Sequence, residues 1–322
     1  MLRDVKIHHN TAGDDGGGIA SKEAISVYDC DISNNEIDGS GGACYFDLDE
    51  GTLGDSIRIV RTKLNNNLLT DTEDEGTAVY MNSDCPVPPV VLFAECLVQG
   101  NEGEDGTFYF DVDGDNGDII VFLESCLFSG NTVYDDGAAL MGSDDTQFWV
   151  YNTTFAGNYA DDDGCVIETG SSSKATLYNC ISFGNDANDG SDGIIDAAGD
   201  IDIFNCYFEH GEDRMSVGGD LSVNTLFTAD DFEDAAFEDF TFDAVNDTPT
   251  AEGNFALSKI SPLVNLGDNG YATNLEKDLA GNARLQEGTV DLGAYESSPL
   301  FFAGLGTAAS PYQIKDWEHL HN

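Results

Sequence analysis

Basic residues are scarce in this chain: Lys and Arg together number 12, against 61 Asp and Glu, and the formal net charge is −49. A phosphate backbone is bound by a basic face, so this balance excludes nucleic acid as an expected partner. Anionic membranes are disfavoured for the same reason. A surface of this sign keeps a protein soluble and attracts cations, which is typical of salty or calcium-rich surroundings.

Long apolar runs are also missing, so the sequence predicts no membrane-spanning segment. The most apolar stretch, residues 85–98, is interrupted by three prolines and by Glu95. Residues 1–4 lack the basic-then-apolar layout of a signal peptide. Because a repeat is already under way at Val5, we expect the natural chain to begin before residue 1.

The sequence does contain an internal repeat, which takes precedence over any other pattern in predicting a fold. Seven similar phrases, among them CLVQGN (96–101) and CLFSGN (126–131), each end in an asparagine. These asparagines are 25 to 34 residues apart: Asn10, Asn35, Asn67, Asn101, Asn131, Asn158 and Asn185. An eighth phrase, CYFEHG (206–211), keeps the frame with Gly in place of Asn.

Two apolar columns precede the Cys or Thr that opens each phrase. Five residues before it stand Ile25, Ile57, Val91, Val121, Phe148, Ala175 and Ile201. Three residues before it stand Val27, Ile59, Phe93, Leu123, Val150, Leu177 and Ile203. The column between them is mixed, as a solvent-facing position allows. This alternation with a period of two predicts a strand.

A bend follows this strand in every repeat, at a polar and turn-prone column. Its members are Asp29, Arg61, Glu95, Ser125, Asn152, Asn179 and Asn205. The bend lets the Cys or Thr point inward again, followed two residues later by another apolar side chain. After each asparagine we expect an acidic loop of variable length, then Gly and a short third strand beginning at Gly18, Gly42, Gly76, Gly106, Gly137, Gly164 and Gly193.

Three short strands per coil, with columns in register, predict an all-β right-handed parallel β-helix of about eight regular coils and an irregular C-terminal cap. An antiparallel sandwich or propeller is the alternative, and it requires hairpin signals at every second strand. Along the chain we predict regular coils over 1–210, irregular last coils and a closing segment over 211–296, and a linker with an incomplete further module over 297–322.

The repeated Asn and Cys positions have structural explanations. Asparagine tolerates a left-handed corner, and stacked amides hydrogen-bond from coil to coil. Five of the eight cysteines share one inward column with Thr62 and Thr153. Buried Cys behaves as a small hydrophobe, and Cβ vectors on neighbouring rungs of this column would run parallel, so we expect free buried thiols. Without a CxxC pair, a zinc site is not predicted.

Three motifs near the C-terminus carry a resemblance to a known family. They are SPLVNLGD (261–268), DLAGNAR (278–284) and VDLGAYE (290–296). In this order they resemble the closing segment of bacterial right-handed parallel β-helix proteins of the pectate-lyase-like superfamily. The upstream repeats are similar to those of polymorphic outer-membrane proteins and related adhesins. This resemblance implies an extracellular or cell-surface β-helix and no specific reaction. Residues 304–320 are similar to the opening of another module of bacterial surface proteins.

Calcium is the best ligand hypothesis. One Gly-containing loop places oxygen ligands at alternate positions, as hard cations require: Asp111, Asp113, Asp115, Asn116 and Asp118. It departs from an EF-hand loop, because Asn116 replaces the sixth-position Gly and Phe122 stands where a bidentate Glu belongs. Lesser acidic clusters comprise Asp47, Asp49, Glu50, Asp55 and Asp161, Asp162, Asp163. The alternative is that all are solvated turns, where Asp, Asn and Gly are common.

An enzyme needs residues that this chain barely has. The lyases of this fold use a basic residue beside calcium-bound Asp, and a −49 surface repels polyuronate. A glycosidase pairs two carboxylates across the sugar, for which Asp135-Asp136, residues 161–163 and the phrase Glu209-His210 are candidates. Acidic runs recur in nearly every coil, however, so we assign no catalytic residue. A polysaccharide lyase or glycoside hydrolase is kept as the alternative function.

Aromatic columns are the remaining feature. Tyr28, Tyr151, Tyr178 and Phe204 occupy one column beside the bend, and the third strands carry Tyr45, Tyr80 and Tyr109. Such ladders either stack on sugars or a partner protein, or cover a corner of the β-helix. The sequence as a whole predicts a non-catalytic, extracellular structural or adhesive segment of a larger protein. We expect its partners to be copies of itself, other surface proteins or glycans.

Overall fold

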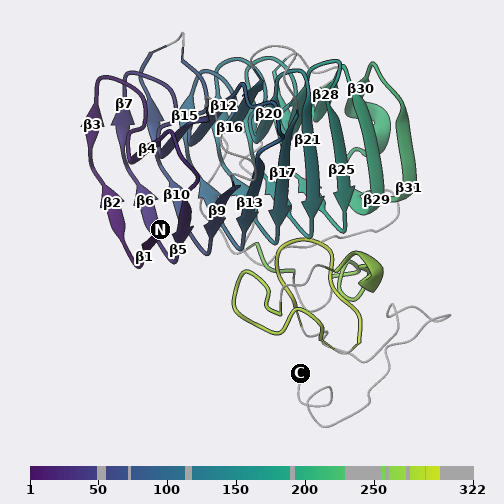
Figure 1. Ribbon diagram of the computed structural model, residues 1–322. Coiled ribbons are helices and arrows are strands. Elements are labelled where there is room, and N and C mark those ends of the chain that lie inside the picture. Colours follow the sequence, from purple (N-terminus) through teal and green to yellow (C-terminus); the bar gives the residue numbers. More distant parts are fainter. Residues whose placement is uncertain are drawn as a thin grey trace, which may run out of the picture.

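A computed structural model describes residues 1–48, 56–71, 74–112, 118–188, 193–228, 255–257, 261–272, 276–286 and 288–297. Short strands repeat coil after coil, and every pairing between named strands is parallel. Figure 1 shows the coils stacked side by side from β1 to β31, with the closing segment below them. The chain is a right-handed parallel β-helix, which confirms the predicted fold class.

The first strand of each coil ends at the bend. These strands are β1 (Leu2–Arg3), β5 (Ser26–Tyr28), β9 (Ser56–Val60), β13 (Val90–Ala94), β17 (Ile119–Glu124), β21 (Thr146–Tyr151), β25 (Lys174–Tyr178) and the first part of β29 (Asp200–Phe208). The second strand follows the bend in the same sheet: β2 (Lys6–His8), β6 (Asp31–Ser33), β10 (Lys63–Asn65), β14 (Leu97–Gln99), β18 (Leu127–Ser129), β22 (Thr154–Ala156) and β26 (Ile181–Phe183).

A two-residue strand comes directly after each asparagine, where we had predicted only a loop. These strands form a sheet of their own: β3 (Thr11–Ala12), β7 (Glu36–Ile37), β11 (Leu68–Leu69), β15 (Glu102–Gly103), β19 (Thr132–Val133), β23 (Tyr159–Ala160) and β27 (Asp186–Ala187). Each regular coil therefore has four strands rather than three. Two residues are too few to show a period, so the pattern could not reveal them.

The last strand of each coil belongs to a third sheet: β4 (Ile19–Ser21), β8 (Cys44–Leu48), β12 (Val79–Ser83), β16 (Phe108–Val112), β20 (Leu140–Gly142), β24 (Ile167–Thr169), β28 (Ile195–Ala197) and β30 (Met215–Val217). These strands begin one to three residues after the predicted glycines. In the first two coils the left-handed glycine before the strand is Gly16 or Gly41.

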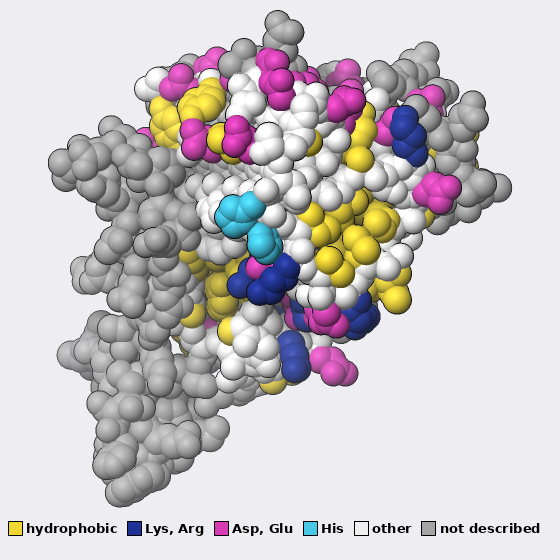
Figure 2. All heavy atoms as spheres, turned by 90° about the vertical axis from the view of Figure 1, so that its left-hand side faces the viewer, with side chains coloured by type: hydrophobic (Ala, Val, Ile, Leu, Met, Phe, Trp, Pro, Cys, Tyr) yellow, Lys and Arg dark blue, Asp and Glu magenta, His cyan; other side chains and the backbone are white. Residues whose placement is uncertain are grey.

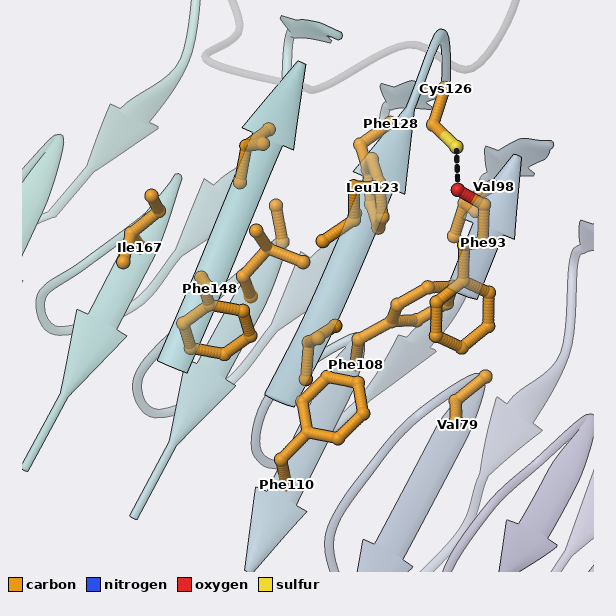
Figure 3. Packing of buried hydrophobic residues seen from close by; sticks show 14 of the residues in the cluster. Val79, Phe93, Val98, Phe108, Phe110, Leu123, Cys126, Phe128, Phe148 and Ile167 are labelled. Carbon is orange, nitrogen blue, oxygen red and sulfur yellow. Dashed lines mark hydrogen bonds between the residues drawn. The ribbon is translucent and has the colours of Figure 1, made fainter. Parts of the chain in front are cut away.

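The predicted inward columns form the core. Val91 pairs with Ile57 and Val121, and Phe93 pairs with Ile59 and Leu123, all without exposed surface. Across the interior, Phe93 and Phe108 have ring centroids 4.5 Å apart, and Phe108 and Phe128 are 4.9 Å apart (Figure 3). Stacking the coils thus buries a continuous apolar interior that no single coil can form.

The bend residues all adopt the left-handed backbone conformation. Their φ values are positive at Asp29, Arg61, Glu95, Ser125, Asn152, Asn179 and Asn205. Three of the seven are Asn, which tolerates this conformation better than most residues. The predicted bend is therefore confirmed in seven successive coils.

The asparagine column is a buried amide ladder. Each Nδ2 donates to the Oδ1 of the next asparagine, at 2.8 to 3.0 Å from Asn10 through to Asn185. Asn101 and Asn131 have no exposed surface. One expected detail is wrong: the left-handed residue is the one before, such as Asn34 or Gly100. The asparagine itself is present for its hydrogen bonds.

All eight cysteines are free and buried, as expected. Burial raises the pKa of the Cys126 thiol well above its ordinary value. That thiol donates to the Phe93 carbonyl at 3.6 Å (Figure 3). These cysteines therefore fill space as small hydrophobes rather than as reactive groups.

The parallel ladder continues past residue 210. The 3₁₀ helix η1 (Gly211–Arg214) leads into β30, and β31 (Leu221–Phe227) pairs with β29. The predicted module over 297–322 lies outside the described residues, apart from Ser297. Among the described residues there is no helix that would cross a membrane.

The closing segment packs along the side of the coils rather than only over their end. Phe255 packs against Leu127 and Ala156, and Leu263 packs against Ile181 and Tyr207. Polar bonds fix the segment as well. Asn179 donates to the Asp268 carbonyl at 3.0 Å, and the Ala294 amide donates to Thr154 Oγ1 at 3.0 Å. The short helix η3 (Asn269–Tyr271) places Tyr271 against Tyr178, with ring centroids 4.5 Å apart.

The three resemblance motifs meet inside this segment as a buried ionic cluster. Arg284 Nε lies 3.4 Å from Glu296 Oε1, and both residues are almost fully buried. Arg284 also donates to the Gly293 carbonyl at 2.7 Å. Asp278 accepts the Glu296 amide at 2.8 Å, and Asp291 accepts the Asn265 amide at 2.6 Å. The conspicuous charges of these motifs therefore hold the closing segment together.

Candidate functional site

The outward face of the third sheet carries a column of aromatic and acidic side chains that makes it the candidate site. One column of it reads Ala20, Tyr45, Tyr80, Tyr109, Met141, Glu168, Asp196 and Ser216, each paired with the next in register. The period of two along each strand turns these side chains away from the core. The column is aromatic in the early coils and acidic in the later ones.

The aromatic half is a stacked ladder. Tyr45 and Tyr80 have ring centroids 5.4 Å apart, and Tyr80 and Tyr109 are 5.6 Å apart. Tyr80 is only 8% exposed, and its hydroxyl donates to Asp111 Oδ2 at 3.5 Å. The rings therefore cover one another's faces, which leaves little flat surface for a sugar. This geometry favours the interpretation of this ladder as cover for the sheet.

The predicted calcium loop is described only at its two ends. Asp113, Asp115 and Asn116 lie outside the described residues, as do Asp49, Glu50 and Asp55 of the lesser cluster. Of the described members, Asp118 accepts a hydrogen bond from Gln147, and Asp47 pairs with Lys22. Asp111 and Asp47 lie in one column with Asn82 between them. The loop thus stays a prediction from sequence.

A second acidic group is assembled at the corner before the third sheet. Asp135, Asp136 and Asp162 each offer a carboxylate oxygen, and these atoms all lie within 4.8 Å of one another. The backbone helps to build this corner: the Asp136 amide donates to Asp105 Oδ1 at 3.3 Å, and the Asp163 amide donates to Asp136 Oδ1 at 2.9 Å. Sequence reasoning had named this set, except Asp105, as candidate acids, and the structure brings three of them together.

A left-handed glycine precedes six strands of the third sheet, from β4 to β24, at this corner. At Gly137, with φ +72°, an added Cβ would lie 2.7 Å from the Cβ of Met141. Only glycine fits this turn without strain. The acidic corner and the outward column are therefore held close together by the backbone.

Burial, together with neighbouring like charges, raises the pKa values of several carboxyl groups here. Burial, followed by repulsion from Asp136 and Asp196, raises the pKa of Glu168 to about 9. Burial also raises the pKa of Asp105 to about 6. Glu168 Oε2 is a buried oxygen without a hydrogen-bond partner. Glu168 is therefore protonated at neutral pH, whereas a solvated glutamate would be ionised.

A hollow of about 440 Å³ lies beside Glu168 and Asp196. Small residues form much of it, including Gly142, Gly170 and Ala197. The strand register puts Glu168 and Asp196 on adjacent rungs, roughly 4.8 Å apart along the stack. The sequence did contain a signal for both acids, because each directly follows the last residue of a predicted third strand.

The candidate phrase Glu209-His210 is separate from this cluster. Glu209 Oε2 accepts the Gly184 amide at 2.8 Å, which ties it to the preceding coil, and His210 is exposed. Both residues line a second, open hollow with Arg214 beside β30. The structure therefore does not join His210 to the acids at Asp135 and Asp136.

Figure 2 views the molecule from the side of the first coil. Acidic side chains gather along its upper edge, and Lys and Arg lie mostly below them. No protein-family model, curated protein or solved structure matches the chain. The parallel β-helix is therefore established by the structure itself, and the site has to be interpreted from its geometry.

Proposed function

We propose that this chain is a non-catalytic structural or adhesive segment of an extracellular or cell-surface protein of the pectate-lyase-like β-helix type. The observation that carries the proposal is the asparagine ladder, which runs without interruption from Asn10 to Asn185. Such a ladder fixes every coil to its neighbours and makes a stiff rod with repeating outer surfaces. A rod of this kind suits the presentation of binding surfaces.

The charge of the chain supports the same role. A net charge of −49 favours a soluble surface protein in cation-rich surroundings and disfavours nucleic acid and anionic membranes. The proposed partners are other copies of the chain, other extracellular proteins or glycans. The resemblance of residues 1–296 to adhesin repeats and to a β-helix closing segment points to the same class.

Calcium is the cation that we propose for the acidic surface. Asp135, Asp136 and Asp162 offer hard oxygen ligands, and their carboxylate oxygens all lie within 4.8 Å of one another, where like charges repel. A divalent cation would relieve that repulsion. The loop from Asp111 to Asp118 is the second proposed location, on its sequence pattern alone.

A direct assay tests the structural role. The chain is incubated with polyuronates and with neutral glycans, with calcium present, and the release of reducing or unsaturated ends is followed. We expect no turnover above a heat-denatured control. Robust turnover would overturn the proposal.

One observation favours a glycoside hydrolase as the second candidate. Glu168 and Asp196 line one hollow on adjacent rungs, and the raised pKa of Glu168 suits a general acid. Asp196 would then serve as nucleophile or base. If turnover is found, Glu168→Gln and Asp196→Asn should each abolish it, whereas Glu36→Gln at an exposed site should leave it unchanged.

A further inference from the structure

The outward face of the first sheet has an apolar centre. Its middle column is held in register from coil to coil and includes Arg58, Leu92, Phe122, Trp149, Thr176 and Asp202, of which Thr176 is buried. Ser26 and Ser222 continue the column on either side. The rings of Phe122 and Trp149 are stacked, with centroids 6.5 Å apart, and both residues are partly exposed. In a chain with 61 acidic residues, such an aromatic centre is out of keeping with a purely solvated face.

The neighbouring column extends this apolar patch. Val90 is 37% exposed and pairs in register with Ile120, which is partly exposed. On β13, β17 and β21, five outward side chains therefore form one apolar surface: Val90, Leu92, Ile120, Phe122 and Trp149. Figure 1 shows these three strands side by side in the middle of the stack.

The two residues that flank the middle stretch of this column carry opposite charges. Arg58 is exposed at one end, and Asp202 is at the other, next to Asp200. Asp202 already pairs with Lys174 at 2.6 Å and keeps further acceptor capacity on its carboxylate. Along the stack the column therefore reads basic, apolar, aromatic, aromatic, small and acidic.

We propose that this face binds the same face of a second copy of the chain, about a two-fold axis that runs parallel to the strands between β17 and β21. The inference names a partner for the proposed structural role, and so rests on that role. The axis reverses the order of the rungs and keeps the position along each strand. Arg58 then faces Asp202 of the other copy, and Phe122 faces its Trp149, each contact occurring twice.

The charge pattern selects this axis over the other two-fold arrangement. An axis along the stack would keep the order of the rungs, so that Arg58 would face Arg58 and Asp202 would face Asp202. Like charges placed opposite each other cost free energy. In the proposed arrangement the neighbouring column also agrees, because Ile120 faces Gln147 and Val90 faces the aliphatic stem of Lys174.

The size of the face sets the expected strength. Six rungs at about 4.8 Å and strands of about five residues give a flat overlap on the order of 400 Å² per copy, to which the relief of the side chains adds surface. The total of on the order of 1,000 Å² is at the lower limit for specific interfaces. We therefore expect a weak, concentration-dependent dimer. Its two sheets would pack about 10 Å apart, as in other face-to-face sheets.

Sedimentation equilibrium of the whole chain tests the proposal at physiological ionic strength, across micromolar concentrations. We expect the wild type to move from monomer to dimer. Phe122→Thr and Trp149→Thr, made as two single variants, should each weaken the dimer at least about tenfold. Thr is chosen because it is the residue at position 176 of the same column. Arg58→Glu should weaken it too, and adding Asp202→Lys to that variant should restore it. Tyr134→Thr, on another face, should have no effect.

A chain that stays monomeric at every concentration would overturn the proposal. A dimer that is weakened by none of Phe122→Thr, Trp149→Thr and Arg58→Glu would also overturn it. Titration with neutral oligosaccharides, followed by Trp fluorescence, provides the other reading of the patch: saturable quenching by a sugar in a monomeric chain would assign it to a glycan instead. The glycan turnover assay is independent of these results, so the two proposals fail separately.

Discussion

Side chains stack from rung to rung at two corners of the coils, and the stacking stabilises the fold at the asparagine corner but opposes it at the acidic corner. At the asparagine corner, amides stack from rung to rung, and each finds a partner at 2.8 to 3.0 Å. At the acidic corner and on the strand beside it, carboxyl groups come together from neighbouring rungs, and burial, followed by nearby like charges, raises the pKa values of Asp105, Asp136 and Glu168. A stack repeats any side chain at the rung spacing. It therefore multiplies attraction between amides and repulsion between carboxylates alike.

The closing segment offers a third case, in which buried carboxylates surround the guanidinium group of Arg284. Arg284→Met should leave Asp278, Asp291 and Glu296 buried without that cation, and should weaken docking of the segment by about 3–5 kcal/mol at pH 8. The loss should shrink at pH 5, because burial raises the pKa of Glu296 to about 8 and that of Asp291 to about 6.

Hydrogen exchange of residues 261–297 measures this effect. Arg61→Met is the matched control, since Arg61 pairs with Asp29 at an exposed position and should cost under about 1 kcal/mol. Equal effects of the two substitutions would show that burial of the pair does not matter here.

Breaking the asparagine ladder should have the next largest effect. Asn131→Ala removes the partner of Asn101 and the donor to the Val98 carbonyl and Asn158. Buried groups left without partners should cost about 2–4 kcal/mol of the free energy of unfolding in urea. Asn10→Ala, at the exposed first rung, should cost under about 1 kcal/mol. A loss at position 131 no larger than at position 10 would contradict a stabilising ladder.

Relieving the acidic corner should have the opposite sign. Glu168→Gln keeps the shape of the side chain and removes the group whose ionisation is most strongly opposed. It should raise the free energy of unfolding by about 1–2 kcal/mol at pH 8, where the unfolded chain ionises this glutamate and the folded chain keeps it protonated. The gain should be much smaller at pH 5, which is close to the ordinary pKa of a glutamate, because ionisation there stabilises the unfolded chain only slightly. Glu36→Gln, at an exposed site, serves as the control. A destabilised Glu168→Gln variant would mean that burial and the neighbouring charges do not oppose the ionised form of Glu168.

Calcium should have the smallest effect. Millimolar calcium should raise the melting temperature by about 2–4 °C relative to chelator. The double substitution Asp135→Asn and Asp162→Asn should remove most of that rise, whereas Glu212→Gln should preserve it. A melting temperature that is the same with calcium and with chelator would show that calcium does not stabilise the fold.

The contrast between the corners also explains what the sequence could predict. Columns such as Val91 or Phe93 recur at every coil with a period of two, so the first strand, the bend and the core followed from the pattern. The strands after each asparagine are too short to show a period. Glu168 was missed because its environment depends on Asp136 and Asp196, which lie 32 and 28 residues away in sequence and on neighbouring rungs in space. The sideways docking of the closing segment through Phe255 and Leu263 has no repeat to predict it.

The pH dependence of stability tests the account most directly. Among the described carboxyl groups with a shifted pKa, nine are raised and only that of Asp29 is lowered. A raised pKa means that the folded chain binds more protons than the unfolded chain, so stability falls as pH rises through that range. Urea unfolding of the wild type between pH 4.5 and pH 9 should therefore show a steady loss of stability. A free energy of unfolding that stays constant or rises with pH would contradict a fold that the asparagine ladder stabilises and the buried acidic groups destabilise.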